Sequence, residues 1–217
     1  MSLIVYGVPL SPFVRKLRLC LAEKALDYEL KIVMPFNQPE WFLEMNPLGR
    51  IPVLKDGDLV LSDSSVICHY LEERNPNSLN LLGRNLEQKA QVRWLEKYAD
   101  YELAPLTTFT VFRNRVLNPS MGKACDEAAI KVALEEKLPK HLDYLQSVLG
   151  DDEFFVGNAI SLADLAFAAQ FASMEHGGEV LDAERWPQLA ALYERVKSRH
   201  SMEGMFAAEQ KILASMA

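Results

Sequence analysis

Cysteine is scarce in this sequence, and the few cysteines are widely separated. Cys20, Cys68 and Cys125 are the three in 217 residues, and no two of them have the C-x-x-C spacing. Because their number is odd, they cannot all pair within one chain. This pattern excludes a zinc ribbon, a dithiol redox motif and a disulfide framework. We therefore expect reduced thiols and a cytoplasmic location.

Histidine is also sparse, and its spacing does not suggest a metal site. The four histidines are far apart, and no two of them have the spacing of metal ligands: His69, His141, His176 and His200. Scattered histidines of this kind are usually structural or lie at the surface. We expect no bound metal.

Long apolar runs and runs of basic residues are missing as well. No segment approaches the roughly 18 apolar residues of a membrane-spanning helix. The start of the chain lacks the basic region of a secretory signal. Lys and Arg number 23 against 30 Asp and Glu, a net charge of −7, whereas nucleic-acid binding needs clustered basic residues. These absences exclude a membrane or nucleic-acid partner, and a hydrophobic content of 49% is typical of a globular protein.

The first eighty residues alternate between strand and helix periodicity. Residues 3–6 and 28–32 predict strands, and Ser11-Pro12 between them predicts a helix start, because Ser favours the N-cap and Pro the first helical position. Asp56-Gly57 between two apolar runs predicts a β-hairpin, and Asp63-Ser64 opens another helix. The order β-α-β followed by β-β-α is the thioredoxin-like arrangement.

The rest of the chain shows helical periodicity and no convincing strand. Five helices are predicted, the first with a kink at Pro105: 86–113, 126–149, 162–174, 188–199 and 202–213. The sequence therefore predicts an α/β plus all-α protein. A thioredoxin-like domain at 1–77 is followed, after a linker at about 78–85, by a helical bundle domain at 86–217.

Ser11-Pro12-Phe13-Val14 occupies the helix start where thioredoxin-like redox proteins carry C-x-x-C. Neither Ser11 nor Val14 can exchange dithiols. Ser11 could donate a hydrogen bond to a thiolate that a ligand brings to this positive helix end, with Arg15 adding charge nearby. The alternative is that Ser11 is only an N-cap.

Two further segments have both a structural and a functional interpretation. The first is the segment Asn46-Pro47-Leu48-Gly49-Arg50-Ile51-Pro52, whose structural interpretation is a turn followed by the start of a strand. Because the chain enters this strand tightly at a proline, the Ile51–Pro52 peptide bond can be cis. A cis bond would expose the backbone N–H and C=O of Ile51 to a peptide ligand. At Asp63-Ser64, an acidic side chain beside free helix N–H groups could hold an amino-acid zwitterion, or could simply cap the helix.

The order and spacing of these motifs resemble the glutathione transferases. Ser at the first helix, N-P-x-G-x-I-P-V-L and D-S-x-x-I occur in the same succession in that family. The chain is similar to serine-type members, with theta-, phi- or tau-like features of a bacterial relative. The resemblance covers nearly the whole chain. It implies a cytosolic enzyme that uses glutathione as co-substrate and acts in detoxification as a homodimer.

The same resemblance implies roles for individual residues. Ser11 would activate the glutathione thiol, and the backbone of Ile51 would pair with the cysteinyl unit. Asp63 and Ser64 would hold the γ-glutamyl end, and Arg50 would lie near the ligand. The loop before the N-P motif usually offers a basic residue to the glycyl carboxylate. This chain has Asn37 and Gln38 there, so Gln38 is the candidate despite that departure.

The second substrate is expected to be a small hydrophobic electrophile bound between the domains. Phe109, Phe112 and Arg113 are candidates, although apolar residues at helical spacing are more often core. Alternatives on the same scaffold are a glutathione-dependent isomerase, dehalogenase or peroxidase. A non-catalytic interaction protein is a further alternative.

One motif of the second domain is expected to be structural. Ser161 and Asp164 in the segment Gly157–Asp164 have the spacing of a capping box, with Ser161 at the N-cap and Asp164 at the third helical position. The family has a similar helix-start signature, and we assign no catalytic role to it.

Overall fold

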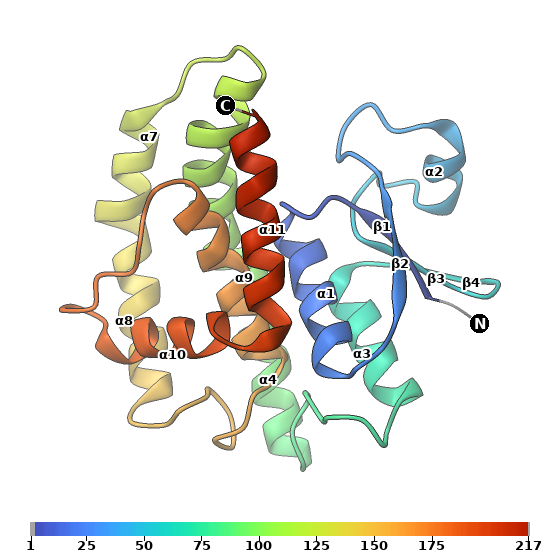
Figure 1. Ribbon diagram of the computed structural model, residues 1–217. Coiled ribbons are helices and arrows are strands. Elements are labelled where there is room, and N and C mark those ends of the chain that lie inside the picture. The colour runs from blue at the N-terminus through green and yellow to red at the C-terminus, as the bar shows by residue number, and fades with distance from the viewer. Residues whose placement is uncertain (1–2, 217) are drawn as a thin grey trace. The chain divides into compact units, whose positions relative to one another are not determined.

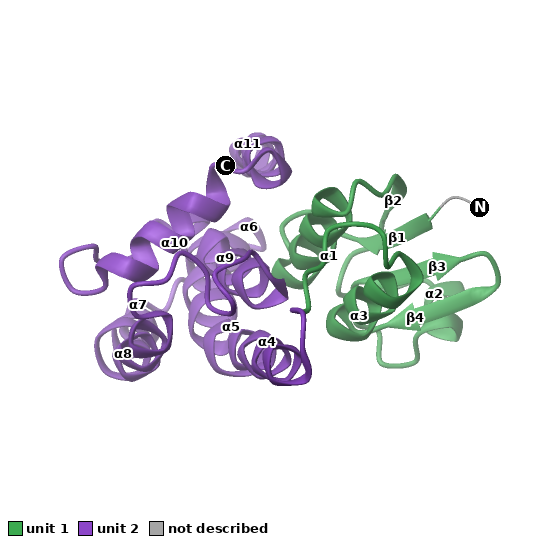
Figure 2. Cartoon of the chain, turned by 90° about the horizontal axis from the view of Figure 1, so that it is seen from below, with its two compact units in different colours: residues 1–82 green, residues 83–217 purple. Residues whose placement is uncertain are grey.

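The computed structural model describes residues 3–216, and the chain forms two compact units, residues 1–82 and residues 83–217 (Figures 1 and 2). The division falls within the segment 78–85 in which the sequence predicts a linker.

Unit 1 contains, within its described residues, a four-stranded mixed sheet and three helices. In chain order these are β1 (Leu3–Gly7), α1 (Pro12–Glu23), β2 (Tyr28–Ile32), α2 (Glu40–Met45), β3 (Val53–Asp56), β4 (Leu59–Ser62) and α3 (Ser64–Arg74). The strand order is β2-β1-β3-β4, with β1 parallel to β2 and antiparallel to β3, and β3 antiparallel to β4. The predicted thioredoxin-like order is confirmed.

The β3–β4 hairpin turns where the sequence predicts it. Gly57, directly after β3, has a φ of 62°, a left-handed conformation that glycine adopts without steric cost. This confirms the Asp-Gly hairpin signal. The short helix α2, by contrast, lies in a stretch for which the sequence predicts no element. It has six residues, and Phe42 is its one buried residue, so it has too little periodicity to be recognised.

The alternation of side chains along the strands gives the sheet two buried faces. Tyr6, Val53 and Phe42 belong to one apolar cluster, so α2 covers that face. Val5 and Leu54 are fully buried and point to the other face, because successive strand residues face opposite ways. Helices α1 and α3 pack against each other on that other face (Figure 1).

Unit 2 is helical throughout its described residues. Its elements are α4 (Leu86–Tyr98), η1 (Ala99–Leu103), α5 (Ala104–Leu106), η2 (Thr107–Leu117), α6 (Asn118–Ser120), α7 (Glu127–Lys131), η3 (Val132–Lys137), α8 (Leu138–Leu149), α9 (Leu162–His176), α10 (Pro187–Lys197) and α11 (His200–Met216), where η marks a π-helix. Helix α9 is the centre of this unit: every residue from Leu162 to Met174 is buried. A helix that is buried all round is a core helix.

The long helical segment from residue 86 to residue 120 changes its hydrogen-bonding pattern on both sides of Pro105. The π-helix η1 precedes this proline and η2 follows it. Proline has no N–H to donate, so the regular ladder cannot pass through this position unchanged. The hydroxyl of Thr110 donates to the carbonyl of Pro105 at 2.8 Å and satisfies one of the carbonyls that this change affects.

Candidate functional site

The register of the sheet brings three separate segments to one end of unit 1. Tyr6 of β1 pairs with Val53 of β3, and Val53 pairs with Ser62 of β4. The end of β1, the start of β3 and the end of β4 are therefore neighbours. Ser11 comes shortly after the end of β1, Ile51 lies shortly before the start of β3, and Asp63 directly follows the end of β4. The topology thus brings three of the residues predicted from the sequence to the same edge of the sheet.

Ser11 is the N-cap of α1, as its sequence context predicts. Its backbone is extended, with φ −72° and ψ 127°, and its hydroxyl oxygen accepts a hydrogen bond from the N–H of Val14 at 3.4 Å. In this bond the hydroxyl acts as an acceptor, so its proton remains available for donation. No residue within 3–216 accepts that proton. The capping role and a role as donor to a ligand are therefore compatible.

Two of the three basic residues of α1 are held inside the protein. Arg15 and Lys16 are each 1% exposed, although long charged side chains are seldom fully buried. The ammonium of Lys16 donates to the hydroxyl of Ser65 at 3.0 Å and joins α1 to the first turn of α3. The helix that begins at Ser11 is thus fastened directly to the helix that begins at Asp63 and Ser64.

Asn46 organises the turn that precedes β3. Its buried side chain donates from Nδ2 to the carbonyl of Arg50 at 2.7 Å and accepts at Oδ1 from the N–H of Leu48 at 3.2 Å. Its own carbonyl accepts from the N–H of Gly49 at 2.9 Å. One asparagine therefore closes the turn on both sides, and the sequence motif alone did not assign it this role.

Gln38 is fastened to the same turn from the preceding loop. Its Nε2 donates to the carbonyl of Gly49 at 2.7 Å. Gly49 has a φ of 60°, and a Cβ atom there would lie 2.5 Å from Oε1 of Gln38. A side chain at this position would therefore be strained and would collide with the amide. One N–H of the Gln38 amide remains for a ligand.

Arg50 and Ile51 leave this turn with unused hydrogen-bonding groups. The Arg50 side chain is exposed and makes no hydrogen bond or ion pair with any residue within 3–216. No described residue hydrogen-bonds the backbone N–H or C=O of Ile51. The Ile51–Pro52 bond is cis, as the sequence permits. A peptide ligand could pair with the free backbone groups of Ile51 as an added strand would.

Asp63 has an unusual backbone conformation at the start of α3. Its φ of 77° is positive, which is rare for a residue other than glycine and costs on the order of 1–3 kcal/mol. Its carboxylate accepts from the N–H groups of Ser65 at 2.9 Å and Val66 at 3.1 Å. Backbone outliers of this kind cluster at functional sites, so capping alone does not account for this residue.

Ser64 begins α3 and is 5% exposed. No described residue hydrogen-bonds its hydroxyl. Beside it, the exposed carboxylate of Asp63 is negative and the helix end is positive. This combination suits a zwitterion, with its ammonium at Asp63 and its carboxylate at Ser64 and the helix end.

The three candidates for the electrophile site lie in η2 of unit 2 and differ in exposure. Phe109 is 51% exposed and Arg113 is also exposed, and these two residues are four positions apart on the helix. Phe112 is 2% exposed and belongs to the interior of unit 2. Their role in binding a second substrate stays a prediction.

Neither a metal centre nor a membrane span is found in the described part of the chain. No three His, Cys, Asp or Glu side chains within residues 3–216 form a group that could hold a metal ion. No helix in the same range has both the length and the apolar character needed to cross a bilayer.

The protein has a thioredoxin-like unit followed by a helical unit, and Ser11 stands where a redox cysteine would be. This combination of fold and site is that of the glutathione transferases. The family models agree: residues 5–79 match the glutathione S-transferase N-terminal domain, and residues 111–205 match the C-terminal domain. The chain therefore belongs to the glutathione S-transferase family and is an enzyme of that class.

Individual relatives support the same assignment. The chain is 37% identical to glutathione S-transferase F10 of Arabidopsis thaliana over 172 residues, 76% of this chain and 78% of that protein. It is 31% identical to FtsZ-localized protein A of Caulobacter vibrioides over 206 residues, 90% and 86% of the two chains. A solved glutathione S-transferase from Rhodospirillum rubrum F11 superposes with a TM-score of 0.85 at 33% identity, covering 94% of this chain and 91% of that one.

Proposed function

We propose that this enzyme conjugates glutathione to small hydrophobic electrophiles and that Ser11 stabilises the attacking thiolate. The observation that carries the proposal is the unused hydroxyl proton of Ser11 at the N-terminus of α1, on the sheet edge shared with Ile51 and Asp63. A neutral hydroxyl donor and a positive helix end both favour an anion over a neutral thiol.

The required stabilisation is modest. A free thiol has a pKa of about 8.5, so only a few per cent is ionised at neutral pH. Lowering the pKa of bound glutathione by about two units needs roughly 2.7 kcal/mol of preferential thiolate stabilisation. One charge-assisted hydrogen bond contributes roughly 1.5–3 kcal/mol, and the helix end adds up to about 1 kcal/mol. Ser11 therefore acts as a donor and need not accept a proton.

The rest of unit 1 binds the tripeptide in this proposal. The backbone of Ile51 pairs with the cysteinyl residue, Asp63 holds the γ-glutamyl ammonium, and Ser64 holds the γ-glutamyl carboxylate. Arg50 and the remaining N–H of Gln38 meet the glycyl carboxylate. Because these contacts fix both ends of the ligand, the sulfur is held beside Ser11, and positioning itself contributes to the rate.

The electrophile contributes the reacting carbon. A new bond forms between the glutathione sulfur and that carbon, and the leaving group departs with the bonding electrons. The thiol proton has already been released to solvent. Phe109 and Arg113, the exposed members of the three candidates, are the proposed contacts for this second substrate. We further propose a cytoplasmic homodimer with a role in detoxification, in keeping with the family.

Retention on immobilised glutathione followed by a conjugation assay with 1-chloro-2,4-dinitrobenzene tests the proposal. We expect retention and conjugation for the unmodified chain, and retention with strongly reduced conjugation for Ser11→Ala. A chain that neither binds the resin nor conjugates any of a panel of electrophiles would contradict it.

A second candidate function is that of an interaction protein without catalysis. The similarity to FtsZ-localized protein A over most of both chains favours it. The two functions are separable, because an interaction protein would bind its protein partner whether or not Ser11 is present. The unused polar groups of Ser11, Arg50, Ile51 and Ser64 favour the enzymatic function.

A further inference from the structure

The two arginines of η2, Arg113 and Arg115, differ in their partners. Arg115 holds the carboxylate of Glu127 with two hydrogen bonds, from Nε to Oε1 at 3.1 Å and from Nη2 to Oε2 at 3.0 Å. Its Nη1 donates to the carboxylate of Glu179. The Arg113 side chain is exposed and makes no hydrogen bond or ion pair with any residue within 3–216. The charge of Arg113 is therefore available to a ligand, and that of Arg115 is not.

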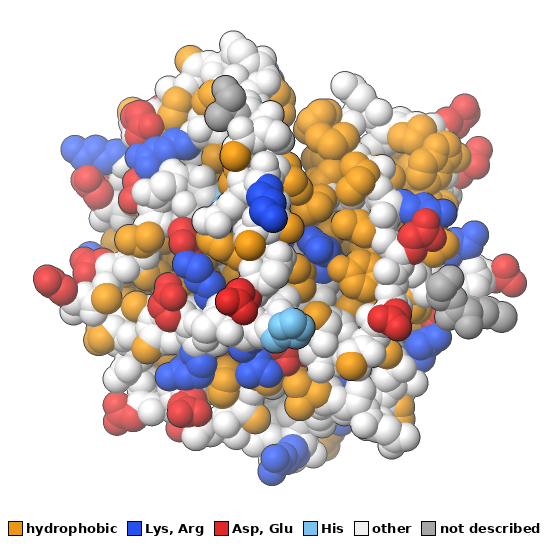
Figure 3. All heavy atoms as spheres, viewed as in Figure 1, with side chains coloured by type: hydrophobic (Ala, Val, Ile, Leu, Met, Phe, Trp, Pro, Cys, Tyr) orange, Lys and Arg blue, Asp and Glu red, His pale blue; other side chains and the backbone are white. Residues whose placement is uncertain are grey.

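The acidic surplus of the chain does not neutralise Arg113. Asp and Glu outnumber Lys and Arg by 30 to 23, and basic and acidic side chains are interspersed on the face that Figure 3 shows. Even so, no acidic side chain in the described part of the chain forms an ion pair with Arg113. An exposed cation with no counter-charge attracts anions more strongly than a paired one does, so this position favours an anionic group.

Phe109 places an apolar surface beside this cation. It lies four positions before Arg113 in η2 and is 51% exposed, whereas Phe112 of the same helix is 2% exposed. Side chains four positions apart in a helix are neighbours on one face, with Cβ atoms roughly 5–6 Å apart. The helix therefore presents an aromatic ring and a free guanidinium side by side.

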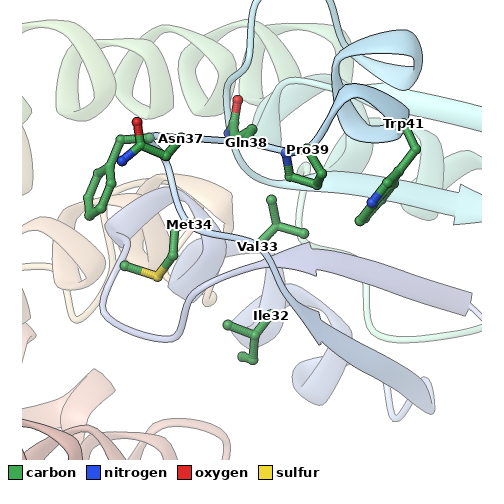
Figure 4. A pocket seen from close by; sticks show the side chains of 8 residues that line it. Ile32, Val33, Met34, Asn37, Gln38, Pro39 and Trp41 are labelled. Carbon is green, nitrogen blue, oxygen red and sulfur yellow. The ribbon is translucent and has the colours of Figure 1, made fainter.

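A hollow of unit 1 offers no comparable place for an anion. It lies between the end of β2 and the start of α2 (Figure 4), and none of the residues that line it is ionisable. Its polar side chains are the carboxamides of Asn37 and Gln38. An anion would lose hydration there without meeting an opposite charge, so Arg113 is the better position for it.

The guanidinium also restricts the kind of anion. Its planar fork matches the two oxygens of a carboxylate, and Arg115 shows this pairing with Glu127 on the same helix. Arg113 supplies one positive charge, which one carboxylate balances. A phosphate group has about 1.5–2 negative charges at pH 7 and would be left partly uncompensated. A carboxylate is therefore the best match.

From these observations we propose that Arg113 determines substrate specificity and selects aromatic electrophiles that carry a carboxylate. The proposal rests on the proposed function and deepens it: Phe109 contacts the ring, and Arg113 pairs with the carboxylate. The glutathione sulfur forms a bond with another carbon of the ring, and the halide on that carbon leaves with the bonding electrons. The thiol proton goes to solvent, and the carboxylate is unchanged.

Two electrophiles that differ in charge test the proposal. They are 4-chloro-3,5-dinitrobenzoate and the neutral 4-chloro-3,5-dinitrobenzamide. Each kcat/KM is divided by the rate constant of the same compound with free glutathione, which removes the difference in intrinsic reactivity. We expect the resulting value to be at least about fivefold higher for the benzoate, the size expected of an exposed pair with two hydrogen bonds. Equal values, or a higher value for the benzamide, would overturn the proposal.

Variants assign the preference to Arg113. Arg113→Gln should lower kcat/KM for the benzoate about five- to tenfold and leave that for the benzamide within about twofold. Arg113→Lys keeps the charge but not the fork, so its value for the benzoate should lie in between. Arg93→Gln makes the same change of charge in α4, at an exposed side chain without an ion pair within residues 3–216, and should leave both substrates unchanged.

Three results with these variants would show that the proposal is wrong. In the first, Arg113→Gln changes neither substrate. In the second, it lowers both equally. In the third, Arg93→Gln lowers the benzoate as much as Arg113→Gln does, which would mean that the net charge of the chain is responsible.

Binding without reaction separates this proposal from the catalytic one. The compounds 3,5-dinitrobenzoate and 3,5-dinitrobenzamide lack the chlorine and do not react, so isothermal titration calorimetry in the presence of glutathione measures their Kd alone. We expect the benzoate to bind about fivefold more tightly, a preference that Ser11→Ala retains and Arg113→Gln loses. A chain with this preference that conjugates neither electrophile would contradict the proposed function but not the role of Arg113. Conjugation of both without preference would contradict the role of Arg113 alone.

Discussion

The buried ammonium of Lys16 donates a hydrogen bond to the hydroxyl of Ser65, 3.0 Å away, and so connects the two helices whose N-termini face the proposed glutathione site. A buried charge is tolerated only when polar groups replace its hydration. Breaking this hydrogen bond therefore lowers the stability of the fold. It also affects function, because the bond fixes α1 relative to α3.

The first prediction follows from this contact. Ser65→Ala removes the acceptor and leaves the Lys16 ammonium buried with one partner fewer, which should lower the free energy of unfolding by roughly 1.5–3 kcal/mol. The Michaelis constant for glutathione should also rise, because the two helix starts lose their fixed spacing. Urea unfolding and steady-state kinetics measure the two effects. Ser78→Ala, at a position in the chain past α3, is the control, and equal effects in both variants would contradict the prediction.

The second prediction concerns Ser11. Ser11→Ala should lose conjugation without gaining any new activity, since it removes the donor and supplies no sulfur. Ser11→Cys should place a thiol at a helix N-terminus, where its pKa is lowered and its thiolate is reactive. We expect a mixed disulfide with glutathione, and glutathione-dependent disulfide reduction in place of conjugation.

Mass spectrometry for the glutathione adduct and titration of the new thiol decide this second prediction. If the introduced cysteine is unreactive with an ordinary pKa and Ser11→Ala remains fully active, the prediction is wrong. The Ser11 hydroxyl would then serve only as a helix cap.

The third prediction concerns the γ-glutamyl end. Asp63→Asn should raise the Michaelis constant for glutathione more than it lowers kcat, because an ammonium contact forms before the reaction and persists through it. The amide can still accept the capping hydrogen bonds from Ser65 and Val66, so the fold should be preserved. Ser64→Ala should act in the same direction, with a loss of roughly 1–3 kcal/mol in binding. An unchanged Michaelis constant in both variants would remove these residues from the site.

The fourth prediction concerns pH and the capping box of α9. Burial raises the pKa of Asp164 from 3.8 to about 6, although hydrogen bonds from the N–H of Phe155 and from the N–H and hydroxyl of Ser161 oppose the shift. Between pH 4 and 6 the folded protein therefore keeps a proton that the unfolded chain has lost. The contribution of this group to stability falls as pH rises through that window, by about 3 kcal/mol in total.

Asp164→Asn should remove this pH dependence. The difference in unfolding free energy between the unmodified chain and the variant should change by about 3 kcal/mol from pH 4 to pH 7, favouring the unmodified chain at the acidic end. Urea unfolding at a series of pH values measures it. A difference that is constant with pH would show that the buried carboxyl has an ordinary pKa. Affinity for glutathione should be unchanged, because the motif is structural.

The sequence was informative wherever the structure depends on neighbours along the chain. The N-caps at Ser11 and Asp63 are bonds to residues two or three positions away, so the local pattern contains both partners. The Asp56-Gly57 hairpin and the Ser161–Asp164 box were predictable for the same reason.

The sequence was uninformative where partners are far apart. The hydrogen bond from Lys16 to Ser65 joins residues 49 positions apart, and the one from Gln38 to Gly49 joins residues 11 positions apart. No periodic pattern in the sequence marks either bond, because each depends on how the elements pack. The change to π-helix around Pro105 was also missed, since a proline predicts a disturbed ladder but not the register in which it continues.

The meeting of β1, β3 and β4 at one sheet edge has a thermodynamic consequence. The groups proposed to bind glutathione are brought together only when unit 1 is folded, so the unfolded chain has no site to offer. Glutathione should then act as a folding ligand, adding about 2.7 kcal/mol to stability at one hundred times its dissociation constant. The melting temperature of the protein would thereby report the concentration of its own co-substrate.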